Sequence, residues 1–334
     1  MSETQSGELF CGVDLGGTSA KLGLADATGK LVCQDSFSTQ TDGNPETVIA
    51  LIGACCKAML ERVGKSSNAS LSGLGMGVPG LVDVKTGVTK FLPNLPTQWR
   101  DVPVAKRLGE LLGCPVRLMN DARTATLGEL RFGCGRGHSD LTFAFFSIGT
   151  GIGGGIAING QIHLGPLGAA GELGHQTILP YGPSCGCGNR GCLETLASGP
   201  AIAAEGVRLV RMGLAPRLRE ITQGDADRVT TETMGQAAEE DPLVAEAINQ
   251  AAEFIGIAAA NVVSILHPDR IVLGGGVSHL GPRLTEPVKR VIGQRVGMFP
   301  TDKIVVECSQ LGSEAGLRGA IALATDWKSV VLQY

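Results

Sequence analysis

Three cysteines and one histidine lie at a spacing that suits a metal ion. The cysteines are Cys185, Cys187 and Cys192, and His175 precedes the first of them by ten residues. Three thiolates and one imidazole complete a tetrahedral zinc site, and the glycines between the cysteines allow the sharp turns that point ligands inward. A redox pair is the alternative, but the C-x-C spacing lacks the C-x-x-C context and leaves Cys192 without a role. We expect a structural zinc ion, because four protein ligands leave no open position for catalysis.

Glycine-rich turns in two parts of the chain could bind phosphate groups. Residues 16–18 read Gly-Gly-Thr, between Asp14 and Lys21, and residues 149–154 read Gly-Thr-Gly-Ile-Gly-Gly. Glycines let successive backbone N–H groups approach an anion, and nearby hydroxyl and ammonium groups add charge-assisted hydrogen bonds. The Asp14 carboxylate suits Mg²⁺, which prefers oxygen ligands. A plain hairpin is the alternative for the first turn alone, but two such turns in similar halves could hold one polyphosphate between them.

A third glycine run and several carboxylates complete the candidate residues. Residues 274–276 are three glycines after a predicted strand, at the edge where α/β sheets bind ligands. Asn120 and Asp121 stand between a short strand and a helix, where helix capping explains either residue, but where a carboxylate is also well placed as a general base. A zinc ion at the cysteines would also gather Glu172 and Glu194. Several short acceptors around one cleft suit a ligand with many hydroxyl groups.

Strands joined by glycine turns must position these groups. Residues 7–37 predict a β-meander, and residues 142–165 repeat its layout about half a chain later. The remaining elements alternate between strands and helices, which predicts mainly parallel sheets covered by helices, in two similar α/β halves. We expect helices over residues 45–63, 103–112, from about 122, 200–212, 231–239, 242–265, 283–296 and 315–324, and strands over residues 71–78, 116–119, 270–273 and 304–306.

Composition excludes several classes of protein. A chain of 334 residues with 43% hydrophobic and 18% charged residues folds, and it is long enough for two domains. A net charge of -4 provides no basic surface for nucleic acid or an anionic membrane. Residues 141–158 are uncharged and as long as a membrane span, but their glycines and β-branched residues favour two buried strands. No signal peptide precedes the first strand, so we expect a cytoplasmic protein.

The combined motifs resemble the ROK family of sugar kinases and repressors over nearly the whole chain. Besides the glycine turns and the cysteine cluster, the resemblance rests on Gly77-Val-Pro-Gly80, Pro93-Asn94-Leu95 with Trp99, Asn120-Asp121-Ala122, and Gly171-Glu-Leu-Gly-His175. It implies the two-lobed actin/hexokinase-like α/β fold, which is related to ribonuclease H. The N-terminal lobe would hold residues 1–121 together with a C-terminal helix at about residues 312–334. Residues 122–311 would form the larger lobe with the zinc site.

The resemblance also implies an activity and the residues that carry it. The protein would be an ATP-dependent hexose kinase that phosphorylates the 6-hydroxyl of glucose, with Asp121 as general base and Asp14 near Mg²⁺. Contacts to the ATP phosphates would come from Gly16, Gly17, Thr18 and Lys21 and from a second loop of Gly149, Thr150, Gly151, Gly153 and Gly154, while Gly274, Gly275 and Gly276 would lie by the adenosine. Sugar contacts would come from Gly80, Asn94, Asn120, Asp121, Glu172, His175 and Glu194.

The sequence leaves alternatives for the sugar, the phosphoryl donor and the class of protein. Arg123 stands where many sugar kinases of the family carry Asn, and fructose, N-acetylglucosamine, N-acetylmannosamine and allose remain alternative substrates. Polyphosphate remains an alternative donor. A sugar-sensing transcriptional repressor is the alternative from another class, but such repressors carry an N-terminal helix-turn-helix domain, and few residues precede the first strand here. We expect a sugar and a nucleotide as partners, no nucleic acid, no membrane, and a homodimer by resemblance alone.

Overall fold

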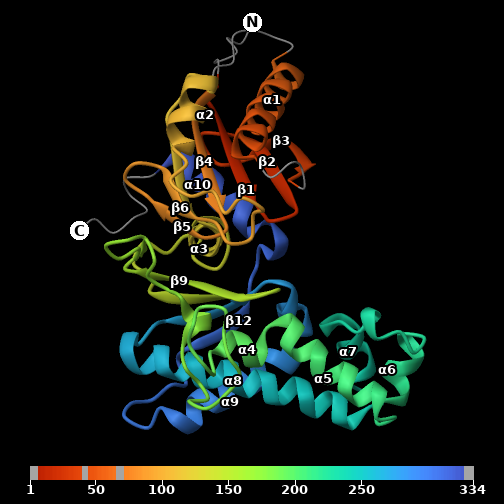
Figure 1. The fold of residues 1–334 in the computed structure, drawn as a ribbon. Helices are drawn as coiled ribbons and strands as arrows, with labels where there is room; N and C mark the ends of the chain where they lie inside the picture. The colour runs from red at the N-terminus through yellow and green to blue at the C-terminus, as the bar shows by residue number, and fades with distance from the viewer. Residues whose placement is uncertain (1–6, 40–43, 65–70, 327–334) are drawn as a thin grey trace, which may run out of the picture. The chain divides into compact units, whose positions relative to one another are not determined.

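The computed structural model describes residues 7–39, 44–64 and 71–326 (Figure 1). These residues fold as two compact units. The first unit contains the described residues up to Asp140, Ile156–Ala170, and those from Glu314 onward. The second unit contains Leu141–Gly155 and Gly171–Ser313. The chain therefore passes between the units four times, and each unit is discontinuous in sequence.

A five-stranded sheet forms the centre of the first unit. Its strand order is β3-β2-β1-β4-β7. The first three strands in the chain pair antiparallel, as the predicted meander requires, and the last two join parallel to β1 and to each other. The strands are β1 (Leu9–Leu15), β2 (Ser19–Asp26), β3 (Leu31–Ser38), β4 (Leu71–Val78) and β7 (Val116–Asn120).

Helices cover both faces of this sheet. Successive residues of β1 face opposite sides of the sheet, and each side packs against a helix. Cys11 contacts Cys56 of one helix, whereas a side chain at Gly12 would collide with Ile321 of another. The core on the Cys11 face is apolar and includes the buried Trp99. The helices of this unit are α1 (Pro45–Val63), α2 (Val104–Leu112), α3 (Asp121–Phe132) and α10 (Ala315–Thr325), and a small hairpin joins β5 (Leu81–Asp83) to β6 (Val88–Phe91).

Helices α3 and α10 pack with their backbones in close contact. An added Cβ at Gly128 would overlap the carbonyl oxygen of Ala315, and one at Gly319 would overlap that of Thr124. Glycine at both positions is therefore what allows the approach. This packing puts α3 in the first unit.

A second five-stranded sheet has the same layout, with the order β10-β9-β8-β11-β12. The predicted repetition of strand, glycine turn and strand is confirmed by this equivalence. Strands β8 and β9 account for the uncharged stretch at residues 141–158, as predicted. The strands are β8 (Phe143–Ile148), β9 (Ile152–Ile158), β10 (Gln161–Ile162), β11 (Arg270–Gly274) and β12 (Val305–Cys308).

Most of the second unit is helical. Among the described helices, α8 alone is long and apolar enough to cross a membrane by length and composition, but more than half of that window is buried inside the protein. It packs against α9, which is typical of a central core helix. The elements are η1 (Leu173–His175), α4 (Leu193–Ala197), α5 (Gly199–Arg211), α6 (Pro216–Ile221), η2 (Ala226–Arg228), α7 (Thr231–Ala237), α8 (Pro242–Leu266), η3 (Gly276–Leu280), α9 (Pro282–Arg295) and η4 (Gly312–Glu314).

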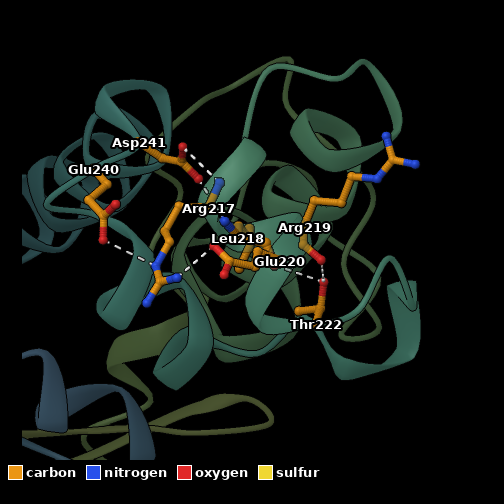
Figure 2. Close-up of polar contacts among 7 residues, drawn as sticks. All are labelled: Arg217, Leu218, Arg219, Glu220, Thr222, Glu240 and Asp241. Carbon is orange, nitrogen blue, oxygen red and sulfur yellow. Dashed lines mark hydrogen bonds and ion pairs between the residues drawn. The ribbon is translucent and has the colours of Figure 1, made fainter.

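The N-terminus of the short helix α6 is capped by Asp241, a residue outside the helix (Figure 2). The buried carboxylate of Asp241 accepts hydrogen bonds from the backbone N–H groups of Arg217, at 3.2 Å, and Leu218, at 2.8 Å. Side chains of Glu220 and Glu240 pair with Arg217. Asp241 therefore supplies the N-terminal cap that α6 lacks, because the residue before the helix, Ala215, has no side-chain acceptor.

Candidate functional site

The predicted metal ligands come together in the second unit. One ligand atom each from His175, Cys185, Cys187 and Cys192 lies within 4.8 Å of the other three. The Cys187 and Cys192 sulfurs are 3.7 Å apart, and the Cys185 sulfur is 3.6 Å from Nδ1 of His175. A zinc ion about 2.3 Å from sulfur and about 2.05 Å from nitrogen would place tetrahedral ligands about 3.8 Å and about 3.6 Å apart. The four side chains therefore fit zinc in both type and spacing.

Glycines shape the loop that carries these ligands. Gly188, with φ +92°, donates its N–H to the carbonyl of Cys185 at 3.0 Å and so reverses the chain between the cysteines. Gly191, with φ +64°, lies so close to Leu179 that a Cβ would overlap its carbonyl oxygen. Burial raises the pKa of the Cys192 thiol to about 12. A cation is needed to keep such a buried sulfur in its thiolate form.

Glu194 connects this loop to the second glycine turn. Its Oε2 accepts the backbone N–H of Ile152 at 2.9 Å, and its Oε1 lies 3.9 Å from the Cys185 sulfur. A side chain at Gly151 would overlap the same carboxylate. Within the turn, the N–H of Gly149 donates to the carbonyl of Gly151 at 2.8 Å. The predicted phosphate loop and the cysteine cluster are thus neighbours through one acidic side chain.

The segment at residues 171–175 lies against the same turn. A Cβ at Gly174 would overlap the carbonyl oxygen of Ile152, so the chain packs directly on the start of β9. Gly171 has φ +90°, and the N–H of His175 donates to the carbonyl of Glu172 at 3.1 Å. The short helix η1 follows from these contacts and places His175 at the cluster.

The first glycine turn joins β1 to β2 in the first unit. It is closed by the N–H of Gly16, which donates to the carbonyl of Ser19 at 2.8 Å. An added Cβ at Gly17 would be 3.0 Å from the carbonyl oxygen of Asn94. A residue predicted to touch phosphate and a residue predicted to touch sugar are therefore in close contact.

Asp14 lies beside this turn, at the end of β1. Its partners across the sheet are Lys21 on β2 and Gly77 on β4. Burial raises the pKa of the Asp14 carboxyl, and the Lys21 charge opposes that change. The carboxylate packs against Gly316, where an added Cβ would lie 2.7 Å from the carboxyl carbon. Sequence reasoning missed Gly316, because only the fold brings the start of α10 to this point.

Asn120 and Asp121 lie at the junction of β7 and α3. The side-chain oxygen of Asn120 caps α3 by accepting the N–H groups of Ala122, at 3.0 Å, and Arg123, at 3.3 Å. Its amide nitrogen donates to the carbonyl of Gly80 at 3.1 Å. Asp121 is the first residue of the helix, and its Oδ1 accepts the N–H of Ala122 at 2.8 Å. The capping interpretation is therefore right for Asn120, which also contacts a second predicted sugar residue.

A cavity of about 490 Å³ opens beside the third glycine run. Gly275 has φ +80° and approaches the end of β8 so closely that a Cβ would overlap the carbonyl oxygen of Ile148. Sequence reasoning found only Gly276 of the lining. The lining residues are Thr231, Glu232, Gly235, Gln236, Gly276, His279, Leu280 and Arg283, from α7, η3 and α9.

The predicted site residues fall into two sets, one in each unit. The first unit holds Asp14, Gly16, Gly17, Thr18, Lys21, Gly80, Asn94, Asn120 and Asp121. The second unit holds Gly149, Thr150, Gly151, Gly153, Gly154, Glu172, His175, Cys185, Cys187, Cys192, Glu194, Gly274, Gly275 and Gly276.

Comparison with known proteins gives consistent matches over nearly the whole chain. The sequence model of the ROK family matches residues 10–327. A glucokinase of Halalkalibacterium halodurans is 33% identical over 93% of both chains. A xylose repressor of Caldicellulosiruptor bescii is 32% identical over 93% of this chain and 77% of the repressor. A crystal structure of a ROK family glucokinase from Streptomyces griseus, in complex with glucose and AMPPNP, is 31% identical with a TM-score of 0.79, covering 95% of this chain and 99% of that chain.

Proposed function

The chain belongs to the ROK family, and from this premise we propose that it is a glucokinase that transfers the γ-phosphoryl group of ATP to the 6-hydroxyl of glucose. The observation that carries the proposal is the contact in the first unit between Gly17 of the first glycine turn and Asn94. It puts a group suited to phosphate next to a group suited to a sugar. Phosphoryl transfer between the two requires this proximity.

Asp121 is the proposed general base. Its carboxylate would accept the proton of the 6-hydroxyl as that oxygen attacks the γ-phosphorus and the bond to ADP breaks. A positioned base of this kind contributes about 10²- to 10⁴-fold to the rate. Its place as the first residue of α3, directly after the Asn120 cap, keeps its backbone fixed. Gly80, Asn94, Asn120, Glu172, His175 and Glu194 would bind the sugar hydroxyls.

The glycine turns would bind the phosphates through backbone N–H groups. The first turn adds the Thr18 hydroxyl and the Lys21 ammonium, and the second is the loop at residues 149–154. Asp14 would hold Mg²⁺ through its carboxylate oxygens. The bound cation would favour the charged form of a carboxyl whose pKa is raised by burial. The ion, when bound, neutralises charge on the phosphate oxygens.

The cavity beside Gly276 would hold the adenosine. Its volume of about 490 Å³ lies within the range of small-ligand sites, and its lining mixes the apolar Leu280 with the polar Thr231 and Gln236. This assignment extends the predicted role of Gly274, Gly275 and Gly276 to side chains of α7 and α9.

The cysteine cluster would hold zinc as a structural ion. His175 would bind it through Nδ1, the nitrogen nearest the Cys185 sulfur, and would keep Nε2 free to donate to a sugar hydroxyl. The ion supplies binding free energy to a loop that has little core of its own. The homodimer, the cytoplasmic location and the division at residues 121 and 122 stay predictions.

A coupled assay of ADP release tests the proposed function. Glucose should be phosphorylated faster than fructose, N-acetylglucosamine, N-acetylmannosamine or allose. Asp121→Asn should lower kcat by about 10²-fold or more and leave glucose affinity within about tenfold, because a role in the transition state is removed. Asp101→Asn, at an exposed ion pair with Lys90, is the control and should retain activity. Full turnover by the Asp121 variant would contradict the base assignment, and no activity with any sugar would contradict the kinase.

A sugar-sensing repressor is the second candidate, because the xylose repressor is about as similar as the glucokinase. The match covers 77% of that repressor. Specific, salt-dependent binding of the purified protein to promoter DNA, without sugar phosphorylation, would favour this candidate over the kinase.

A further inference from the structure

Arg123 is a buried cation bonded to Asn120, one of the predicted sugar residues. It is the third residue of α3, and 1% of its surface is exposed. Its Nε donates to the carbonyl of Ala170 and its Nη2 to that of Ala169, both at 2.8 Å. Its Nη1 donates to the side-chain oxygen of Asn120 at 2.9 Å. Three nitrogens of the guanidinium group are thus bonded to protein oxygens.

A positive charge is unfavourable at this position for two physical reasons. Burial removes the hydration of the guanidinium group, and the first turn of a helix favours negative rather than positive charge. A neutral side chain would remove these penalties, but neither it nor a lysine would replace all three hydrogen bonds. Only arginine has a planar fork that reaches two successive carbonyls and still donates to a third oxygen. The contacts made by Arg123 therefore explain this residue type at this position.

On one side, Arg123 fixes the direction of the Asn120 amide. The amide oxygen of Asn120 accepts from two backbone N–H groups and from Arg123, and its nitrogen donates to Gly80. Turning the amide over would place its NH₂ group against three donors. The orientation of Asn120 is therefore set by this network.

On the other side, Arg123 fixes the main chain before Gly171 and Glu172. Its two carbonyl partners, Ala169 and Ala170, are the last two residues of the segment that ends at Ala170 in the first unit. The N–H of Ala170 also donates to the carbonyl of Leu164 at 2.9 Å, which closes the loop after β10. The position of Ala169 and Ala170, from which the chain continues to Gly171, is therefore fixed by these hydrogen bonds.

We propose that Arg123 is a positioning residue for sugar binding, which orients Asn120 and fixes the main chain that leads to Glu172. The inference rests on the function proposed above. It gives a physical role to the departure from the family pattern at Arg123: the guanidinium group acts on the sugar through two other residues, and each of its three nitrogens donates to a protein oxygen.

Enzyme kinetics of Arg123 variants test the effect on the sugar. Arg123→Met keeps much of the side-chain length and removes all donors, so the KM for glucose should rise about tenfold or more, which is the effect of losing a buried charged hydrogen-bond partner. The KM for ATP should stay within about twofold. Arg123→Lys keeps the charge but not the fork and should fall between the wild type and Arg123→Met. Arg131→Gln is the matched control on the same helix, at a partly exposed ion pair with Asp326, and should leave both KM values unchanged.

Hydrogen exchange of the same variants tests, without an activity assay, whether Arg123 fixes Asn120 and the main chain at Ala169 and Ala170. Faster exchange at both residues 116–126 and 164–172 in Arg123→Met, but not in Arg131→Gln, is the expected result. Lower stability with both KM values unchanged in the folded fraction would mean a merely structural role and would overturn the proposal. If Arg123→Met does not fold, Arg123→Lys and Arg123→Gln carry the same two measurements. If the wild type phosphorylates no sugar, the proposed function fails. Unchanged exchange at residues 164–172 in Arg123→Met would separately overturn the proposal that Arg123 fixes this segment.

Discussion

The two glycine turns have similar sequences and similar places in their sheets, but different groups hold them. The first, at residues 16–18, is closed by Ser19 and is bonded by the backbone and side chain of Thr39, which directly follows β3. The second, at residues 149–154, is bonded by the Glu194 carboxylate and by the N–H of Gly199. The first turn therefore depends on its own sheet, and the second on the two helices that directly follow the cysteines.

The comparison shows that the repeated motif determines the backbone path, whereas the residues around each turn determine how that turn is held. The pattern of strand, glycine and strand produces the same backbone path twice, because glycine allows the tight reversal in both places. The order and stability of each turn then depend on neighbours that the motif does not contain. Changes in those neighbours should affect the two turns differently.

The largest expected difference comes from removing the metal site. Cys192→Ser should abolish zinc binding, measured by elemental analysis, because apparent zinc binding of about 10–16 kcal/mol requires the full ligand set. Hydrogen exchange should then increase at residues 149–154 and 171–199 and stay unchanged at residues 16–18. Cys308→Ser, outside the cluster, is the control. A wild-type protein that contains no zinc and still protects residues 171–199 would contradict the prediction.

A second pair of glycines should show equal effects in the two sheets. Strands β4 and β11 both occupy the fourth place in their sheets, and Gly80 and Gly275, soon after them, both have positive φ values. A Cβ at Gly80 would overlap the carbonyl oxygen of Phe91, and one at Gly275 would overlap that of Ile148. Changing either glycine to Ala should lower the free energy of unfolding by roughly 2–4 kcal/mol in denaturant titrations.

Gly113→Ala is the control for these two variants. Gly113 also has a positive φ, but apart from its immediate surroundings in the chain, no atom of the described residues comes within 4 Å of the place that an added methyl group would take. This variant should therefore lose only about 1 kcal/mol, from the backbone conformation alone. Equal losses at all three glycines would show that backbone conformation, and not the close carbonyl, sets the effect.

Replacing Asp14 should change stability by a smaller amount that depends on pH, and the equivalent change in the second sheet should not. Burial raises the pKa of its carboxyl, so the folded state binds the proton more tightly and stability falls as the pH rises above the ordinary Asp value of about 3.9. Asp14→Asn should therefore be more stable than the wild type at pH 7 and lose that advantage below about pH 3.9. Thermal unfolding across pH measures this, and phosphoryl transfer should fall in the same variant.

Ser147→Ala is the matched variant in the second sheet. Ser147 pairs with Gly274 as Asp14 pairs with Gly77, but it carries no charge. Its stability should show no comparable pH dependence. A pH-dependent change as large as that of Asp14→Asn would contradict the assignment to the buried carboxyl.

The smallest effect is expected at Gly149. In the part of the chain that the structure describes, no atom lies within 4 Å of a methyl group added there, so Gly149→Ala should change stability by less than about 0.5 kcal/mol. Gly17→Ala, which meets the Asn94 carbonyl at 3.0 Å, should cost about 1 kcal/mol. If phosphate approaches the second turn closely, Gly149→Ala should still raise the KM for ATP. An unchanged KM for ATP would argue against that approach.

The sequence was informative where a function needs residues that are close along the chain. The cysteine cluster and the two meanders were predictable for this reason, because C-x-C-x₄-C and the glycine turns are local patterns. The cap at Asn120 was open to two interpretations, and its contacts show that it caps α3 and also contacts Gly80.

Features that depend on distant segments could not be predicted. The two backbone carbonyl partners of Arg123 lie more than forty residues away, and Gly316 meets Asp14 only after α10 has packed on the first sheet. The cavity beside Gly276 is lined by four residues of α7, a helix that carries no motif, and by residues of η3 and α9. The assignment of α3 to the first unit likewise follows from glycine contacts with α10 that no local pattern reveals.

The contact between α3 and α10 has a consequence for biosynthesis. On the ribosome, residues 171–313 emerge before α10, so the second unit can become compact while the first sheet still lacks one of its covering helices. Gly12 and Gly75 on that sheet stay exposed to water until α10 arrives, because Ile321 and Ala320 of that helix are what cover them. The face of the first sheet that α10 covers is therefore completed last. A nascent chain stalled before residue 315 would expose part of that face to chaperones.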